Sequence, residues 1–215
     1  MSNHALAERH RLAGLLAAAG PDAPTLCAGW TTRDLAAHLV LREHRPDAAA
    51  GIRIGPLAGW TERVRTGYAK RPYEELLRTF RAGPPLLSPF ALPGADEAAN
   101  TVEYFVHAED VLRAGDPWQA RPVPPGRAEA LWRRLPLLAR LEGRRSPARL
   151  ELCHPDGRSL TAGPAGAPTV RITGEPGELV LFVHGRGART ELSVDGPPDA
   201  LAALHHLFPL PAARG

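Results

Sequence analysis

The sequence predicts an α+β fold, with a helical bundle over residues 1–145 and a small α+β domain over residues 146–215. Up to about residue 145, apolar residues recur at three- and four-residue spacing, which is typical of amphipathic helices. Beyond residue 146, short segments alternate apolar and polar residues between turn residues, which is typical of strands. A chain of 215 residues has room for both parts.

The first part contains four or five predicted helices, and their longish connections suit an antiparallel four-helix bundle. Ser2 or Asn3 can cap the first helix. Thr31 or Thr32 can cap the second, and Asp34 in its first turn favours the positive end of the helix dipole. The predicted helices cover about residues 3–19, 32–45, 72–83, 96–114 and 126–143.

The second part opens with a predicted hairpin, ARLELCHPDGRSLTAG (148–163), whose Pro-Asp-Gly turn separates two alternating segments. Two further strands are predicted in PTVRITG (168–174) and ARTELSVDG (188–196). PPDALAALHHLF (197–208) is predicted to close the chain as a helix.

One run in this part, GEPGELVLFVHGRG (174–187), fits a strand or a helix, because a short apolar run suits both. We favour a helix. Pro176 and Glu178 suit its first turn, and Gly185 or Gly187 suits its C-cap.

Charge and composition argue against several function classes. The net charge is +3, yet the arginines are scattered among acids, so no nucleic-acid groove is expected. The N-terminus carries charges where a signal peptide needs an apolar run, and no stretch approaches a membrane span. With only Cys27 and Cys153, a disulfide framework is not expected. We expect a cytoplasmic monomer or homodimer with reduced thiols.

The segment TVEYFVHAED (101–110) carries the first sign of a site. Its apolar residues have helical spacing, and Glu103 and His107 lie four residues apart on one face. Such a polar stripe is usually the solvated face of a helix. Here, however, Phe105 and Val106 widen the apolar arc, so the pair lies near its edge, where half-buried side chains need partners.

His38 gives a second sign, because it shares a helix face with Leu35 and Leu39. A lone histidine among leucines is most often a hydrogen-bonded core residue. Together with Glu103 and His107, however, His38 forms a set of two histidines and one carboxylate. Helical bundles build metal sites from such inward-facing side chains. Three protein ligands leave an open position, which is the catalytic arrangement for zinc, although nickel, iron and manganese accept the same ligands.

The same residues lie in two motifs, LCAGWTTRDLAAHLVLRE (26–43) and EYFVHAEDVLRA (103–114). The pair resembles the mycothiol-dependent maleylpyruvate isomerase-like proteins, which belong to the wider DinB-type group of metal-binding four-helix bundles. The resemblance implies that His38, Glu103 and His107 bind the metal. It also implies a DinB-like four-helix bundle followed by a small C-terminal α+β domain.

The resemblance further implies a divalent metal, with Zn2+ favoured, and mycothiol or a similar thiol as cosubstrate. A metal-bound thiol loses its proton and becomes a thiolate nucleophile at neutral pH. The thiolate would add to an electrophilic substrate, as in an isomerase, or displace a leaving group, as in an S-transferase. The competing hypothesis is a non-catalytic metal-binding or regulatory interaction module.

Four further residues are candidates for supporting roles. Asn100 and Asp110 lie on the ligand face of their helix and could orient the ligands by hydrogen bonds. Arg42, one turn beyond His38, could hold a substrate carboxylate. In isomerases of the family an arginine of the C-terminal domain assists substrate binding, and Arg186 is the candidate here.

Arg42 and one further residue, Cys27, each have a plainer alternative. Arg42 could form an ordinary surface ion pair with Glu43 or Asp47. Cys27 precedes the helix of His38 and could approach the pocket, but a buried structural cysteine is the better expectation.

Overall fold

The computed structural model describes residues 4–86, 88–91 and 94–211. It divides the chain into two compact units, Met1–Trp118 and Gln119–Gly215. This division falls earlier than the boundary expected at residue 145. The reason is α7 (Pro125–Glu142), which the sequence assigned to the bundle but which packs on α8 (Pro176–Leu181) and on β2 (Ser159–Ala162).

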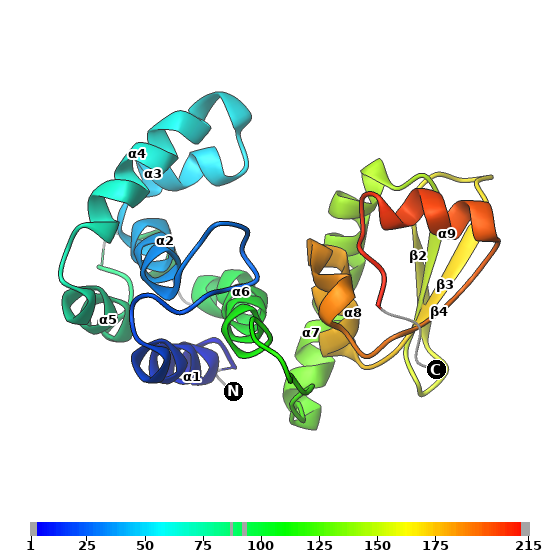
Figure 1. Ribbon diagram of the computed structural model, residues 1–215, viewed down its shortest axis with the longest axis horizontal. Coiled ribbons are helices and arrows are strands. Elements are labelled where there is room, and N and C mark those ends of the chain that lie inside the picture. Colours follow the sequence, from blue (N-terminus) through cyan, green and yellow to red (C-terminus); the bar gives the residue numbers. More distant parts are fainter. Residues whose placement is uncertain (1–3, 87, 92–93, 212–215) are drawn as a thin grey trace. The chain divides into compact units, whose positions relative to one another are not determined.

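The described residues of the first unit form helices and loops, and four of the helices make the predicted bundle (Figure 1). Two more helices, α3 (Pro46–Ala49) and α4 (Ala58–Ala69), lie in a stretch without a predicted element. The α4 sequence contains two glycines and buries only Val64 and Arg65, so its periodicity is weak. The bundle helices are α1 (His4–Ala19), α2 (Thr32–His44), α5 (Tyr73–Ala82) and α6 (Ala95–Leu112). The proposed caps of α1, Ser2 and Asn3, lie outside the described residues.

The start of α2 is fixed by a capping box, which confirms Thr31 as the N-cap. The Thr31 side chain accepts a hydrogen bond from the Asp34 backbone N–H, and Asp34 Oδ2 accepts one from the Thr31 backbone N–H at 3.0 Å. Arg65 from α4 donates to the other Asp34 oxygen, at 2.5 Å. Because the first turn is held from both sides, the position of His38 further along α2 is well defined.

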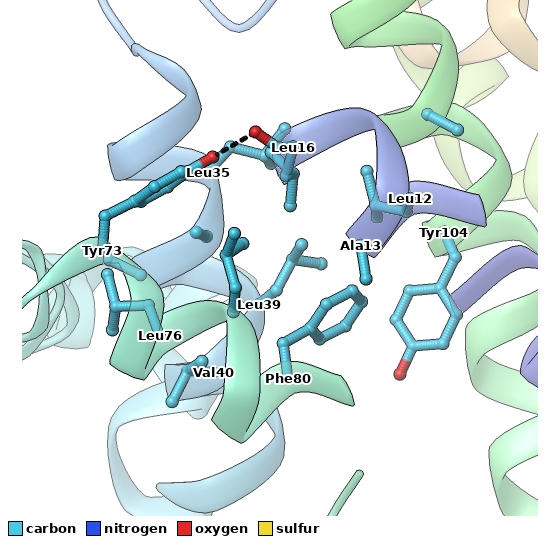
Figure 2. Close-up of a cluster of buried hydrophobic side chains, with 14 residues drawn as sticks. Leu12, Ala13, Leu16, Leu35, Leu39, Val40, Tyr73, Leu76, Phe80 and Tyr104 are labelled. Carbon is cyan, nitrogen blue, oxygen red and sulfur yellow. Dashed lines mark hydrogen bonds between the residues drawn. The ribbon is translucent and has the colours of Figure 1, made fainter. Parts of the chain in front are cut away.

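The core of the bundle is a cluster of fully or nearly fully buried side chains from all four helices (Figure 2). Leu39 of α2 and Phe80 of α5 have no exposed surface, and Phe80 meets Tyr104 of α6 edge to face, with ring centroids 5.4 Å apart. Tyr73 also belongs to this cluster, and its hydroxyl donates to the Leu16 carbonyl at 2.8 Å (Figure 2). This core holds α2 against α6, the two helices that carry the candidate ligands.

The second unit contains a mixed four-stranded sheet of order β2-β1-β3-β4. The predicted hairpin is confirmed, because β1 and β2 pair antiparallel, while β1 and β3 pair parallel and β3 and β4 antiparallel. The closing helix, α9, packs on β3 (Figure 1). The remaining bounds are β1 (Arg149–Cys153), β3 (Thr169–Thr173), β4 (Ser193–Asp195) and α9 (Pro198–His205).

The ambiguous run folds as a helix, as favoured. α8 continues into a π-helical turn, η5 (Phe182–Arg186), and ends where Gly185 adopts the left-handed conformation with φ +79°. Short 3₁₀ turns complete the described elements: η1 (Ala50–Ile52), η2 (Gly55–Leu57), η3 (Pro89–Ala91), η4 (Gly143–Arg145) and η6 (Gly187–Arg189). Among the described residues, no helix combines the length and the apolar character that crossing a membrane requires.

Candidate functional site

His38, Glu103 and His107 come together in the first unit. Glu103 Oε1 lies 3.3 Å from Nε2 of His38 and 3.3 Å from Nε2 of His107. One ligand atom from each of the three residues lies within 4.8 Å of the other two. His38 and Glu103 are 65 residues apart in the sequence, so this cluster depends on the packing of α2 against α6.

The polar stripe of α6 is not a solvated face. The His107 side chain is 11% exposed and the Glu103 side chain 24%, and His38 on α2 is equally enclosed at 8%. Tyr104, Phe105 and Ala108 of the same helix are fully buried, so α6 is enclosed on more than one side. The carboxylate and the imidazoles therefore meet in a partly desolvated space, where unpaired polar groups would be costly.

The surroundings of the two histidines affect their pKa values differently. Burial lowers the pKa of His38, and the charges of His107 and Arg42 add to this effect, which favours the neutral imidazole. Burial also opposes a charge on His107, but hydrogen bonds with Asp110, Cys27 and Glu103 outweigh it and raise the pKa of His107 well above its usual range. The pKa values of the two histidines are therefore shifted in opposite directions.

Glu103 is the anionic member of the cluster. Burial works against its charge, but Arg42 and the two histidines overcome this and hold the pKa of Glu103 well below its usual range. Arg42 Nε lies 3.4 Å from Glu103 Oε1. A half-buried carboxylate with a lowered pKa beside an imidazole with a lowered pKa is donor chemistry that divalent cations select.

Arg42 contacts the ligand set directly. The expected alternative, a surface ion pair, is not what the structure shows, because Glu43 pairs with Arg9 and Asp47 with Arg45. Arg42 instead donates to Asn100 Oδ1 and packs over the Phe90 ring, 4.7 Å from its centroid. Asn100 in turn donates to Asp96 at 2.7 Å, so Asn100 reaches the ligands through Arg42 and not through either histidine.

Asp110 lies where an orienting residue is expected. Its Oδ2 is 2.9 Å from Nδ1 of His107, and its side chain has no exposed surface. An ionised carboxylate only accepts hydrogen bonds, so Nδ1 carries a proton and Nε2 points towards Glu103. Nε2 is therefore the nitrogen offered to a metal.

The loop before α2 reaches the site through Cys27 and Trp30. The approach of Cys27 was the less favoured of its two expected placements, and its side chain is half-buried and not fully buried. The contact of Trp30 was not anticipated. Cys27 Sγ lies 3.1 Å from Asp110 Oδ2 and 3.9 Å from His107 Nδ1. The ring of Trp30 packs against His38 with centroids 5.1 Å apart, and Arg65 covers Trp30 at 4.9 Å. The only sequence signal for these contacts is the closeness of the loop to His38 along the chain.

Arg186 belongs to the second unit, in the π-helical turn that follows α8. Its Nη1 donates to the His184 carbonyl at 2.6 Å, and His184 Nδ1 is 2.8 Å from the Val180 carbonyl oxygen. These local bonds hold Arg186 at the end of the helix. A role for Arg186 in substrate binding stays a prediction.

The cluster fits a divalent metal. Ligand atoms around a tetrahedral zinc ion lie about 3.3–3.5 Å apart, which matches the 3.3 Å from Glu103 Oε1 to each Nε2. A second group of possible ligand atoms, from Cys27, His107 and Asp110, lies on the other side of the His107 ring. The first group has both imidazoles and one carboxylate, and it leaves coordination positions open.

The fold of the chain is shared with known proteins. A family model described as mycothiol maleylpyruvate isomerase N-terminal domain matches residues 3–194. A crystal structure of the mycothiol-dependent maleylpyruvate isomerase has a TM-score of 0.59 and 14% identity, and a mutant of that enzyme has 0.61 and 13%. In each case 89% of this chain and 90% of the other are covered, so the fold is shared. No curated protein matches the chain.

Proposed function

The chain belongs to the mycothiol maleylpyruvate isomerase family, and from this premise we propose that it is a divalent-metal-dependent enzyme. Its cosubstrate would be mycothiol or a similar low-molecular-weight thiol. The observation that carries the proposal is that ligand atoms of His38, Glu103 and His107 lie within 4.8 Å of one another. Three protein ligands would leave a coordination position of a zinc ion for the thiol. Zinc is the favoured ion because imidazole and carboxylate ligands suit it.

A divalent cation in this site would lower the pKa of a coordinated thiol and so supply a thiolate nucleophile at neutral pH. Addition of a thiolate to an electrophilic cis double bond forms a C–S bond and leaves a single bond, about which the substrate rotates. Elimination then breaks the C–S bond, restores the double bond in the trans form and returns the thiolate. Displacement of a leaving group by the same nucleophile would give an S-transferase.

The residues of the chain have distinct tasks in this proposal. His38, Glu103 and His107 hold the cation, and Asp110 keeps the proton of His107 on Nδ1. Arg42 keeps Glu103 ionised. Arg42 is the proposed anchor for a substrate carboxylate, because it lies beside the ligand set and a guanidinium binds carboxylates with two parallel hydrogen bonds.

Metal analysis of the purified full chain is the first test. The proposal expects about one divalent ion per chain, and loss of that ion in both His38→Ala and His107→Ala. The matched control is His206→Ala, which removes an exposed histidine of α9's C-cap in the second unit. If His38→Ala and His107→Ala both keep the ion, the metal binds at another site and the proposal is wrong.

The second test separates an enzyme from a module. The metal-loaded protein is incubated with mycothiol and either maleylpyruvate or a chlorinated aromatic electrophile. Isomerisation without net loss of thiol indicates an isomerase, and stoichiometric loss of thiol indicates an S-transferase. A metal-loaded protein that reacts with neither supports the alternative, a non-catalytic metal-binding or regulatory module.

A further inference from the structure

The carboxylate of Asp110 is shared by two groups. Its Oδ2 lies 2.9 Å from His107 Nδ1 and 3.1 Å from Cys27 Sγ. An ionised carboxylate can only accept hydrogen bonds. Asp110 Oδ2 therefore accepts one from the Cys27 thiol and one from the Nδ1–H of His107. The Asp110 side chain is fully buried, so these two bonds form without competition from solvent.

The loop that carries Cys27 is attached to α6 at the same residue. The backbone N–H of Leu26 donates to the Asp110 carbonyl at 3.0 Å. Within the loop, Thr25 Oγ1 accepts from the Cys27 N–H at 3.2 Å and donates to the Trp30 carbonyl at 2.9 Å. These bonds fix the backbone of Cys27 beside Asp110.

We propose that Cys27 is a positioning residue of the metal centre. Its thiol orients the Asp110 carboxylate, and the carboxylate in turn holds the His107 ring so that Nε2 faces Glu103 and the metal. The inference rests on the proposed function and adds to it a residue that acts on the ligand through another side chain.

A direct role of Cys27 as a metal ligand is the rival arrangement. The three ligand atoms of the proposed centre include His107 Nε2, whereas Cys27 lies on the Nδ1 side of the ring, 3.9 Å from Nδ1. Cys27 Sγ instead lies 3.1 Å from Asp110 Oδ2, the same oxygen that lies 2.9 Å from His107 Nδ1. The hydrogen bonds therefore favour positioning over ligation.

The test compares Cys27→Ala and Cys27→Ser in the full chain. Removing a hydrogen-bond partner of a metal ligand costs about 10- to 100-fold in affinity, and Cys27 acts one bond further away. We expect Zn2+ affinity, measured by competition with a chromophoric chelator, to fall about 3- to 10-fold in Cys27→Ala. Cys27→Ser keeps a donor and should stay within about twofold of the parent protein. Cys153→Ala is the matched control for loss of a thiol elsewhere in the chain.

Absorption of the Co2+-loaded protein distinguishes the rival. A thiolate-to-cobalt charge-transfer band that disappears in Cys27→Ser would make Cys27 a ligand and overturn the proposal. Equal affinity in Cys27→Ala and the parent, or equal loss in Cys27→Ala and Cys27→Ser, would also overturn it. Unchanged far-ultraviolet circular dichroism confirms that each variant is folded.

A metal-free measurement keeps this test independent of the proposed function. The ¹⁵N resonances of the His107 ring report which nitrogen carries a proton. In the metal-free protein these resonances should move in Cys27→Ala and keep the parental values in Cys27→Ser. If the parent chain binds no metal, the proposed function fails. Identical His107 resonances in all three proteins would refute the role of Cys27.

Discussion

Glu103 Oε1 lies 3.3 Å from His107 Nε2, one turn along the same helix. Helical spacing alone brings these two residues onto one face, but the anionic state of Glu103 depends on Arg42, which reaches it from α2. The carboxylate thus contributes both an oxygen ligand and a negative charge to the proposed centre.

Glu103→Gln separates these two contributions, because it keeps the shape of the side chain and removes its charge. We expect the affinity for Zn2+ to fall by more than about tenfold, since a neutral amide is a much weaker ligand for a divalent cation. Competition with a chromophoric chelator measures the change. Glu74→Gln on the exposed face of α5 is the matched control, and an equal affinity in both variants would contradict the assignment of Glu103 as a ligand.

The affinity for metal should rise with pH across the neutral range. The pKa of His107 is raised well above 6.5, so Nε2 of His107 must lose a proton before it can bind a cation. Zn2+ binding should therefore release about one proton from His107 at neutral pH. Calorimetry in buffers of different ionisation enthalpy measures the release, and a heat independent of the buffer would contradict it.

In the metal-free protein the raised pKa of His107 also makes the free energy of unfolding depend on pH. A folded-state pKa above the unfolded value of 6.5 means that His107 stabilises the fold fully below about pH 6.5, and that this contribution is lost as the pH rises through the folded value. Urea titrations at several pH values can follow this loss. Asp110→Asn should make the free energy of unfolding fall less as the pH rises, since the hydrogen bond with Asp110 is the largest contribution that raises the pKa of His107.

Arg9 and Glu43 form a buried ion pair that should be sensitive to the loss of one partner. Arg9 Nη1 lies 2.7 Å from Glu43 Oε2, with side chains 3% and 0% exposed. Arg9→Met leaves Glu43 buried without its counter-ion and should lower the free energy of unfolding by about 3–5 kcal/mol. The double variant Arg9→Met/Glu43→Gln also removes the charge of Glu43. Urea denaturation should therefore show a smaller loss of unfolding free energy in the double variant than in Arg9→Met alone.

Leu39 tests the core that supports the site. It has no exposed surface and belongs to the cluster shared by the four bundle helices. Leu39→Ala should cost about 2–5 kcal/mol of unfolding free energy through lost burial and the cavity it leaves. Leu86→Ala, at a position 94% exposed in the same unit, should change stability by less than about 0.5 kcal/mol. Similar effects of the two substitutions would mean that the cluster is not the core.

The sequence predicted the elements whose signals are local. The i, i+4 spacing of Glu103 and His107, the capping residue Thr31 and the Pro-Asp-Gly turn each act within a few residues, so their structural outcomes could be anticipated. The residue types suggested that His38 completes a ligand set with Glu103 and His107, and the family resemblance strengthened this link. Periodicity alone could not make it, because it says nothing about which helices pack together.

The elements that could not be anticipated depend on tertiary contacts. An amphipathic pattern shows that α7 has an apolar face but not that this face meets α8 and β2. Arg42 is within reach of Glu43 and Asp47 along the chain, yet its partners come from α6. Cys27 has no sequence neighbour that would mark its bond to Asp110, because the two are 83 residues apart.

The separation of 65 residues between His38 and Glu103 gives a bound ion a second effect. An ion held by both residues would act as a reversible cross-link that closes the chain segment containing α3, α4 and α5. Because the unfolded chain lacks the site, the ion would shift the unfolding equilibrium towards the native state. By the same linkage, a substitution in α5 that lowers the free energy of unfolding would also lower the apparent affinity for the ion, although α5 carries no ligand.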